Sequence, residues 1–197
     1  MPVMERKKRK LPVVLTVSEA ESLLLAARNS VNDARTASKQ LCAWRDFVMV
    51  QTGLLAGCRV AELCDLNVEN VDLGGATLAI IEGKGLKDRN VPIGAKLLTV
   101  LREWIGERKT GPLFPGPNGK RLLPRTFQRR ILTLVKAANI HKAVSPHKLR
   151  HTFACGLLRS GADVREVQEL LGHANLQTTA VYLHVDTSRL KAAVDRL

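Results

Sequence analysis

The stretch LLGHANLQTTAVYLH, residues 170–184, decides how the rest of this chain is interpreted, because it holds the chain's one tyrosine, Tyr182. A free phenol ionises at about pH 10, so it is a poor nucleophile at neutral pH unless nearby cations stabilise its oxyanion. If the chain uses a tyrosine for covalent chemistry, it has no second candidate. We therefore searched the rest of the sequence for cations that can activate Tyr182.

The composition indicates a basic, globular protein of about one large domain. Its 197 residues suffice for a sizeable core, and 31 lysines and arginines against 18 acidic residues give a net charge of +13. Such an excess favours a polyanionic partner, nucleic acid first and an anionic membrane surface second, over a basic but otherwise ordinary enzyme. No apolar run has the length of a membrane span and no secretory signal follows the basic N-terminus, so we expect a cytoplasmic protein.

The cysteines and histidines do not predict a metal site. The four cysteines are scattered without a CxxC pair, which argues against disulfides and structural zinc and fits a reducing cytoplasm. His147 and His151 are spaced i, i+4, but the glutamate of an HExxH motif is missing. We therefore expect neither a metal ion nor a cofactor.

Local patterns predict a mixed, mainly α fold with one small antiparallel sheet. Thr16 and Glu19 form a capping-box pattern before an apolar helical stretch. Residues 77–81 and 90–93 predict a hairpin whose tip, residues 82–89, is rich in glycine and lysine. Further helices are expected over residues 41–55, 60–66, 97–105, 124–140, 146–159, 164–171, 175–182 and 188–197, after a basic flexible tail at residues 1–10.

Two motifs place cations beside glycines. Arg59 follows a glycine bend at Gly57, and Glu62 lies one helical turn later, which fits either a structural salt bridge or a positioned cation. In GKGLKDR, residues 83–89, glycines on both sides of Lys84 allow a tight turn to project an ammonium group that can act as an acid. The alternative for this second motif is an ordinary solvated turn.

Two further motifs add histidines. In SPHKLRHT, residues 145–152, His147 and Arg150 share one helix face and point at a common spot, where they can bind a phosphate. His173 precedes Tyr182 in the opening stretch. Together the motifs supply what phosphoryl transfer from DNA to a phenol needs: two guanidiniums for the non-bridging oxygens, a proton donor and a nucleophile.

The four motifs in this order resemble the tyrosine recombinase (phage integrase) family. TGLLAGCRVAEL, residues 52–63, resembles the family's first-arginine box, and Lys84 its β-hairpin lysine. His147 with Arg150 resembles the HxxR box, and LLGH with Tyr182 the final histidine and nucleophile. The resemblance runs from about residue 11 to 184.

The resemblance implies a catalytic-domain fold of the DNA breaking-rejoining type and a role for each motif residue. Arg59 and Arg150 would bind the scissile phosphate, and Tyr182 would attack it, leaving a 3′-phosphotyrosyl link without metal or ATP. Lys84 would be the general acid, with Lys87 as its rival. His147 would assist proton transfer and His173 would hydrogen-bond the phosphate.

The resemblance also implies DNA contacts and self-association. The helix from Pro124 resembles the family's major-groove helix. The expected contacts to double-stranded DNA are Lys87, Arg89, Arg125, Thr126, Gln128 and Arg129. Residues 187–197 resemble the segment that docks on a neighbouring protomer, which implies a tetrameric synapse on DNA.

The domain expected from the resemblance covers residues 11–186, and the separate N-terminal DNA-binding domain of most relatives is expected to be absent. The chain would then be an excised catalytic domain or a minimal recombinase resembling the fimbrial-switch invertases. A non-catalytic DNA-binding protein and a type IB topoisomerase-like enzyme are the alternative functions.

Overall fold

The structure, a computed structural model, describes residues 14–81 and 88–172. Four predicted site residues (Lys84, Lys87, His173 and Tyr182) lie outside the described residues, as do the basic tail and the two last expected helices. The elements in chain order are α1 (Val17–Asn32), α2 (Ala37–Ala56), α3 (Val60–Asp65), the 3-10 turn η1 (Val68–Asn70), β1 (Val71–Asp72), β2 (Thr77–Ile80), β3 (Arg89–Pro92), α4 (Ala95–Ile105), the 3-10 turn η2 (Pro117–Gly119), α5 (Pro124–Ala137), α6 (Pro146–Ser160) and α7 (Val164–Leu171). The predicted fold class, mainly helical with a small antiparallel sheet, is confirmed.

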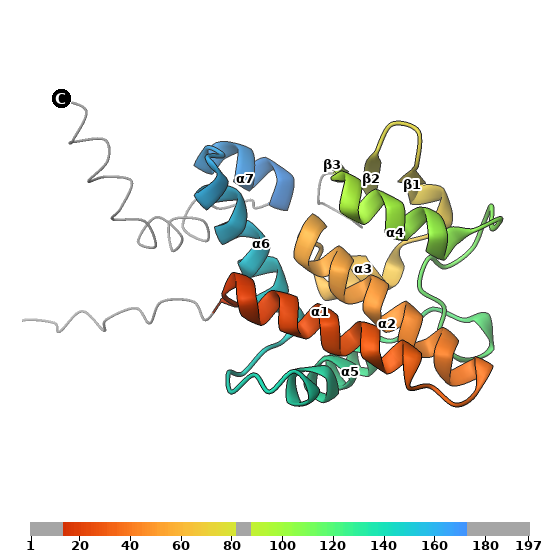
Figure 1. The fold of residues 1–197 in the computed structure, drawn as a ribbon. Coiled ribbons are helices and arrows are strands. Elements are labelled where there is room, and N and C mark those ends of the chain that lie inside the picture. The colour runs from red at the N-terminus through yellow and green to blue at the C-terminus, as the bar shows by residue number, and fades with distance from the viewer. Residues whose placement is uncertain (1–13, 82–87, 173–197) are drawn as a thin grey trace, which may run out of the picture.

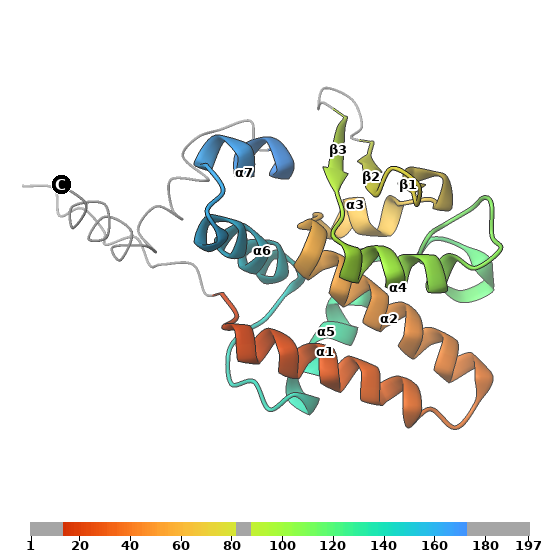
Figure 2. The ribbon, with the colours of Figure 1, turned by 45° about the horizontal axis from the view of Figure 1, so that its top comes forward.

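Helix α2 is the centre of the fold. It buries residues on nearly all sides, including Val48, Met49 and Val50, so it is covered by other helices rather than amphipathic. Helix α1 lies alongside it, and α4, α5 and α6 pack around the rest (Figures 1 and 2). The C-terminal end of α2 lies between the α6–α7 pair and the sheet, and this is where the first arginine motif begins.

The predicted capping box at the start of α1 is present. The Thr16 hydroxyl accepts from the Glu19 amide at 3.2 Å, and the Glu19 carboxylate accepts from the Thr16 amide at 2.7 Å. Leu23 and Ala27 are fully buried, as their helical spacing predicts. A fixed start of α1 holds this helix in register along α2.

The sheet has one strand more than the sequence predicted. Strands β2 and β3 pair with Leu78 opposite Val91, as expected for the hairpin, but β1 adds an edge strand with Val71 opposite Leu78. The turn-rich composition of residues 67–75 concealed β1, because a two-residue strand is too short to show alternation. Strand β3 begins at Arg89, so this residue belongs to the sheet and not to the hairpin tip.

Helices α6 and α7 pack on each other through a small core of their own, while Leu149 of α6 belongs to the main core. Ala154, Cys155, Val167 and Leu171 are buried there, apart from the main core around α2. Helix α7 ends at Gly172, which adopts the left-handed conformation of a C-cap. Helix α7 therefore ends at a defined residue immediately before the predicted His173 in the sequence.

No helix within the described ranges combines the length and apolar character that crossing a membrane requires. All four cysteines lie in those ranges and are free thiols, with only Cys42 exposed.

Replacing Gly57 by alanine should lower the free energy of unfolding by about 2 kcal/mol, because two penalties add. Gly57 has φ +63°, a conformation that L residues adopt only with strain, and it ends α2. A Cβ there would also lie 2.3 Å from Cδ1 of Phe153, so α6 or this ring would have to move. Denaturant unfolding of the two proteins measures the difference.

Gly156→Ala is the matched control, because Gly156 lies inside α6 and a Cβ there meets nothing within 4 Å. Alanine in a helix interior should raise the free energy of unfolding by about 0.5 to 1 kcal/mol. Equal stability of Gly57→Ala and wild type would show that the end of α2 is not fixed against α6.

Candidate functional site

Three arginines surround one carboxylate at the C-terminal end of α2. Glu62 Oε1 accepts from Arg59 Nη1 at 2.5 Å, and Glu62 Oε2 accepts from the Arg59 amide at 2.7 Å. Arg89 Nη2 donates to Glu62 Oε2 at 2.8 Å, and Arg150 Nη1 lies 3.8 Å from that same oxygen. We call these four residues the arginine cluster. The sequence left open whether Arg59 and Glu62 form a salt bridge or a positioned cation, and the structure shows the salt bridge.

Backbone carbonyls at two helix ends hold the remaining arginine donors. Arg150 donates to the carbonyl of Gly57, the C-cap of α2, at 2.7 Å, and to the carbonyl of Leu171 in α7. Arg59 donates to the carbonyl of Gly172 at 2.9 Å. Helix C-termini carry partial negative charge and stabilise cations. The fold therefore holds the arginines with partial charges as well as with Glu62.

The arginine cluster carries an excess of positive charge. Three guanidiniums face one carboxylate, and two of the arginines are nearly enclosed, with side chains 2% exposed at Arg150 and 8% at Arg89. Burial lowers the pKa of Arg150 to about 10, Arg59 adds to the lowering and Glu62 opposes it. The pKa of Arg150 stays well above neutral pH, so this buried guanidinium remains charged, and the four residues of the cluster together carry more positive than negative charge. Arg59, 37% exposed, faces solvent.

His147 lies on α6 one turn before Arg150, and its edge meets the ring of His151 with the centroids 4.2 Å apart. Partial burial, then Arg150, Lys148 and Arg59, lower the pKa of His147 below its usual 6.5. The imidazole is therefore neutral at pH 7, and a neutral imidazole has one nitrogen that can accept a proton. His147 and Arg150 therefore lie close enough for their charges to interact.

The NMR titration of His147 should show a midpoint below pH 6.5. Because the folded pKa is lower than the unfolded one, this residue's contribution to stability is complete above pH 6.5 and is lost as the pH falls through the folded pKa. His147→Asn identifies the resonance. A midpoint at or above 6.5 would contradict the proximity of the arginines.

Cys58, next to Arg59, is not a competing nucleophile. Its side chain is buried, and burial raises the pKa of its thiol to about 12, with Glu62 as the next cause. A thiol that stays protonated at neutral pH is inert. Cys58 therefore fills space between the arginines and the core.

Family comparisons agree with this geometry. The sequence profile described as the phage integrase family matches residues 13–189. This chain belongs to the phage integrase family. It is 38% identical over 194 residues to the tyrosine recombinase XerC of Alcanivorax borkumensis, covering 95% of this chain and 60% of the relative. It is 36% identical over 200 residues to XerC of Thermodesulfovibrio yellowstonii, covering 96% and 63%.

Solved integrase-family structures have the same fold. The XerA recombinase matches with a TM-score of 0.79 at 34% identity over 96% of this chain and 66% of that one. The XerH recombinase bound to palindromic difH substrate matches with a TM-score of 0.77 at 30% identity, over 94% and 53%. The catalytic domain of bacteriophage HP1 integrase matches with a TM-score of 0.66 at 26% identity, over 93% and 94%. The chain thus spans about three fifths of the XerC relatives and nearly all of the isolated catalytic domain.

For this integrase-family chain, the structure brings together three of the six predicted catalytic residues: Arg59, His147 and Arg150. The other three, with Lys87, are not described. Sequence reasoning did not place Glu62 between three arginines. It also expected Arg89 to contact DNA, whereas the structure directs that guanidinium inward onto Glu62 and the carbonyl of Leu170.

Helix α5 carries three of the predicted DNA contacts on its outer face. Arg125, Gln128 and Arg129 are exposed, while Phe127 and Ile131 face the core. The first turn of α5 contains no acidic residue, although acidic residues are the ones that stabilise a helix N-terminus. Arg125 there disfavours the isolated helix, and an anion bound beside it would compensate.

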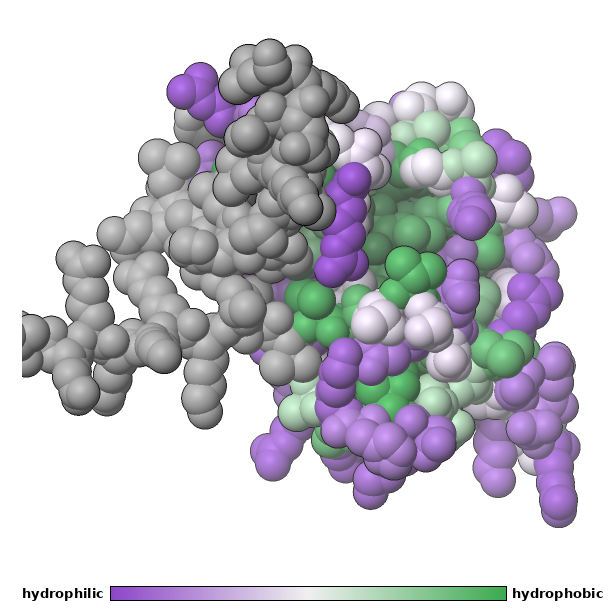
Figure 3. Space-filling view, turned by 60° about the vertical axis from the view of Figure 1, so that its left-hand side comes forward, coloured by the Kyte–Doolittle hydropathy of each residue, from purple (hydrophilic) through white to green (hydrophobic). Residues whose placement is uncertain are grey.

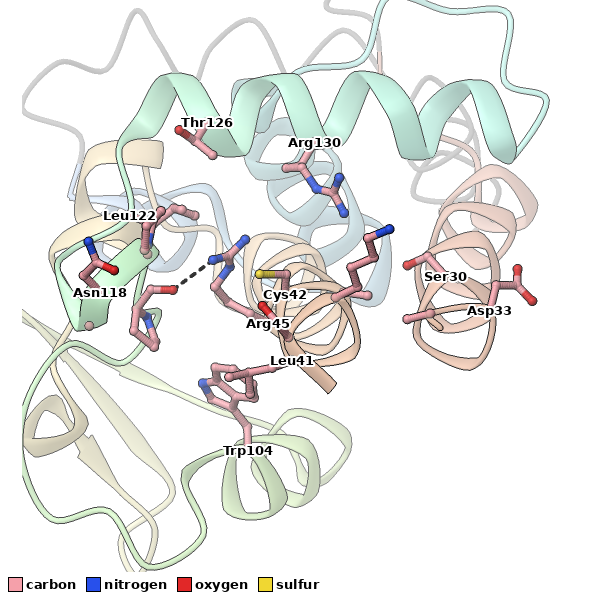
Figure 4. A pocket seen from close by; sticks show the side chains of 18 residues that line it. Ser30, Asp33, Leu41, Cys42, Arg45, Trp104, Asn118, Leu122, Thr126 and Arg130 are labelled. Atoms are coloured by element: carbon pink, nitrogen blue, oxygen red, sulfur yellow. Dashed lines mark hydrogen bonds between the residues drawn. The ribbon is translucent and has the colours of Figure 1, made fainter. Parts of the chain in front are cut away.

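A separate cavity of about 930 Å³ lies at the other end of α2 (Figure 4). Trp104, Leu122 and Arg130 line it, together with Thr126, the one predicted DNA contact that faces this side of α5. Arg45 donates to the carbonyl of Pro115 at 2.9 Å across its floor. No residue of the arginine cluster lines this cavity, so it is not part of the candidate site.

Figure 3 shows part of the face on the α6–α7 side. Where it is visible, hydrophilic side chains gather along the lower and right-hand edges and hydrophobic ones lie recessed between them. Among the described residues no three His, Cys, Asp or Glu side chains gather as a metal-binding set.

Proposed function

We propose that this chain is the catalytic part of a site-specific DNA recombinase that cleaves and rejoins DNA through a 3′-phosphotyrosyl link on Tyr182. The observation that carries the proposal is the arginine cluster, in which three guanidiniums from separate elements converge on the carboxylate of Glu62. A phosphodiester gains negative charge on its non-bridging oxygens in the transition state, and fixed cations stabilise that charge. The resemblance of the motifs and the membership of the family support the proposal.

The chemistry assigns one step to each residue. Arg59 and Arg150 hold the non-bridging oxygens of the scissile phosphate, and His173 adds a hydrogen bond. The phenol of Tyr182 passes its proton to the neutral imidazole of His147, directly or through water, and its oxygen forms a bond to phosphorus. The bond to the 5′-oxygen breaks, and Lys84 gives that oxygen a proton. The phosphotyrosine preserves the bond energy, so the 5′-hydroxyl of another strand can reverse the step without ATP.

The proposed partner is double-stranded DNA. XerH, which has the same fold, is described as bound to its difH substrate. In this chain the exposed arginines on α5 and the net charge of +13 supply phosphate contacts, and Gln128 is suited to base edges. Assembly into a tetramer on DNA, with residues 187–197 docking on a neighbour, is part of the proposal.

Trapping of a covalent complex tests this function. Wild-type protein is incubated with DNase-nicked DNA of the organism that encodes it, since a nick near the cut releases a short fragment and prevents rejoining. Complexes that survive detergent are recovered and their DNA sequenced. We expect recovery of one preferred sequence, and the captured duplex then serves for kinetics.

The alternatives give different results in the same assay. A DNA-binding protein without catalysis would retain DNA at 50 mM salt, lose it steeply by about 200 mM salt, and yield no detergent-resistant complex. A topoisomerase-like enzyme would form complexes without sequence preference and would relax supercoiled plasmid as a monomer. Either outcome rejects the recombinase assignment.

A further inference from the structure

Arg89 is held by Glu62 and by the end of α7. Its Nη2 donates to Glu62 Oε2 at 2.8 Å, its Nη1 lies 3.3 Å from Glu62 Oε1, and its Nε donates to the carbonyl of Leu170 at 2.9 Å. All three nitrogens of one guanidinium therefore have protein acceptors. With 8% of its side chain exposed, Arg89 is also one of the more buried charges of the protein.

The end of α7 lies directly on this guanidinium. A Cβ at Gly172 would lie 3.0 Å from Arg89 Nη1 and 3.2 Å from Arg89 Cδ, closer than a side chain tolerates easily. Gly172 has φ +61°, so glycine meets both the conformational and the spatial requirement. Arg89 thus joins three elements that are distant in sequence: β3, Glu62 on α3, and the C-cap of α7.

The two partners of Arg89, Glu62 and the end of α7, also hold the other two arginines of the cluster. Glu62 holds the backbone amide and Nη1 of Arg59. The end of α7 supplies the carbonyls of Gly172 and Leu171 to Arg59 and Arg150. Fixing Glu62 and α7 therefore fixes the separation of the two guanidiniums that face a phosphate.

We propose that Arg89 is a positioning residue of the recombination site and not a DNA contact. Resting on the proposed function, this role is to hold Glu62 and the end of α7 so that Arg59 and Arg150 engage the same phosphate. Lysine cannot replace it, because one ammonium on a flexible stem cannot span both carboxylate oxygens and a carbonyl in the fixed geometry of a planar fork.

The test compares wild type, Arg89→Lys and Arg89→Gln on the captured duplex. At saturating DNA we expect the single-turnover cleavage rate to fall about 30-fold or more in both variants, because the oxyanion donors lose their alignment. DNA affinity should change by less than about 3-fold, because no phosphate contact is removed. Arg102→Gln, which removes an exposed arginine on α4, is the matched control and should cleave at the wild-type rate.

A second substrate separates positioning from loss of fold. A methylphosphonate at the scissile position removes one charged non-bridging oxygen, so the arginine pair contributes less to its cleavage. The defect of each Arg89 variant should shrink about 5-fold or more on this DNA, because only the stabilisation of that charge is impaired. The two rates come from one protein sample, so their ratio does not depend on the fraction folded.

The possible results distinguish failure of the proposed function from failure of the inference about Arg89. If wild type forms no adduct, the proposed function fails and the inference fails with it. If wild type reacts and Arg89→Lys reacts equally fast, only the inference fails. A loss of affinity without a loss of rate would make Arg89 a DNA contact, and an equal defect on both substrates would make its role structural; each of these overturns the inference.

Discussion

Arg150→Ala is expected to lower the single-turnover rate of adduct formation about 1,000-fold, the largest loss typical for one donor to a developing oxyanion. The side chain is 2% exposed and joins α6 to two helix ends through the carbonyls of Gly57 and Leu171. Its removal therefore takes one cation from the phosphate and removes the donor to two buried carbonyls. Arg150→Lys should recover less than about a tenth of the lost rate, because lysine does not reproduce the planar fork.

Arg45→Lys is the matched control for a buried arginine. Arg45 also donates hydrogen bonds to a carboxylate, that of Asp46, and to a backbone carbonyl. It lies on α2 about 18 Å from Gly57 along the helix axis, and so far from the arginine cluster. The Arg45→Lys substitution should change the unfolding midpoint, while the folded protein keeps the wild-type cleavage rate. Wild-type activity of folded Arg150→Ala would remove Arg150 from the site.

Glu62→Gln is expected to lower the free energy of unfolding by about 3 kcal/mol, because Arg59 and Arg89 each lose an ion pair with a buried carboxylate. The net positive charge of the arginine cluster would rise by one. Sulfate should therefore raise the unfolding midpoint of the variant more than that of wild type. Adduct formation by the folded fraction should also fall about 100-fold, because Arg59 loses its anchor.

The control for Glu62 is Glu103→Gln, since Glu103 is an exposed carboxylate on α4. The free energy of unfolding of this variant should stay within about 0.5 kcal/mol of wild type, and sulfate should raise the unfolding midpoints of both proteins equally. A Glu62→Gln protein as stable as wild type would contradict the central place of Glu62 in the cluster.

The sequence was informative wherever the chain makes local interactions. The capping box at Thr16, the proline start of α5 and the range of α7 follow from neighbouring residues, so the structure confirms them. The strand β1 was missed because two residues are too few to show the alternation of apolar and polar side chains that marks a strand. Its pairing with β2 is a contact that the local sequence does not reveal.

The residue types of the site were predictable from the sequence, but the contacts between these residues were not. The pair Arg59 and Glu62 is visible at a helical spacing. The inward turn of Arg89 has one signal, since it shares a strand face with the buried Val91, two residues later. No local pattern predicts that the carbonyls at the end of α7 accept hydrogen bonds from Arg59, Arg89 and Arg150, which come from three different parts of the chain. Such contacts depend on how separate elements pack.

The most direct test of the account is to identify the residue that carries the DNA. The trapped complex is digested with nuclease and trypsin, and the peptide that keeps a nucleotide is sequenced by mass spectrometry. We predict the tryptic peptide of residues 166–189 with the 3′-phosphate on Tyr182, and no modified peptide from Tyr182→Phe. A nucleotide on any other residue, or an equal yield from Tyr182→Phe, would contradict the account.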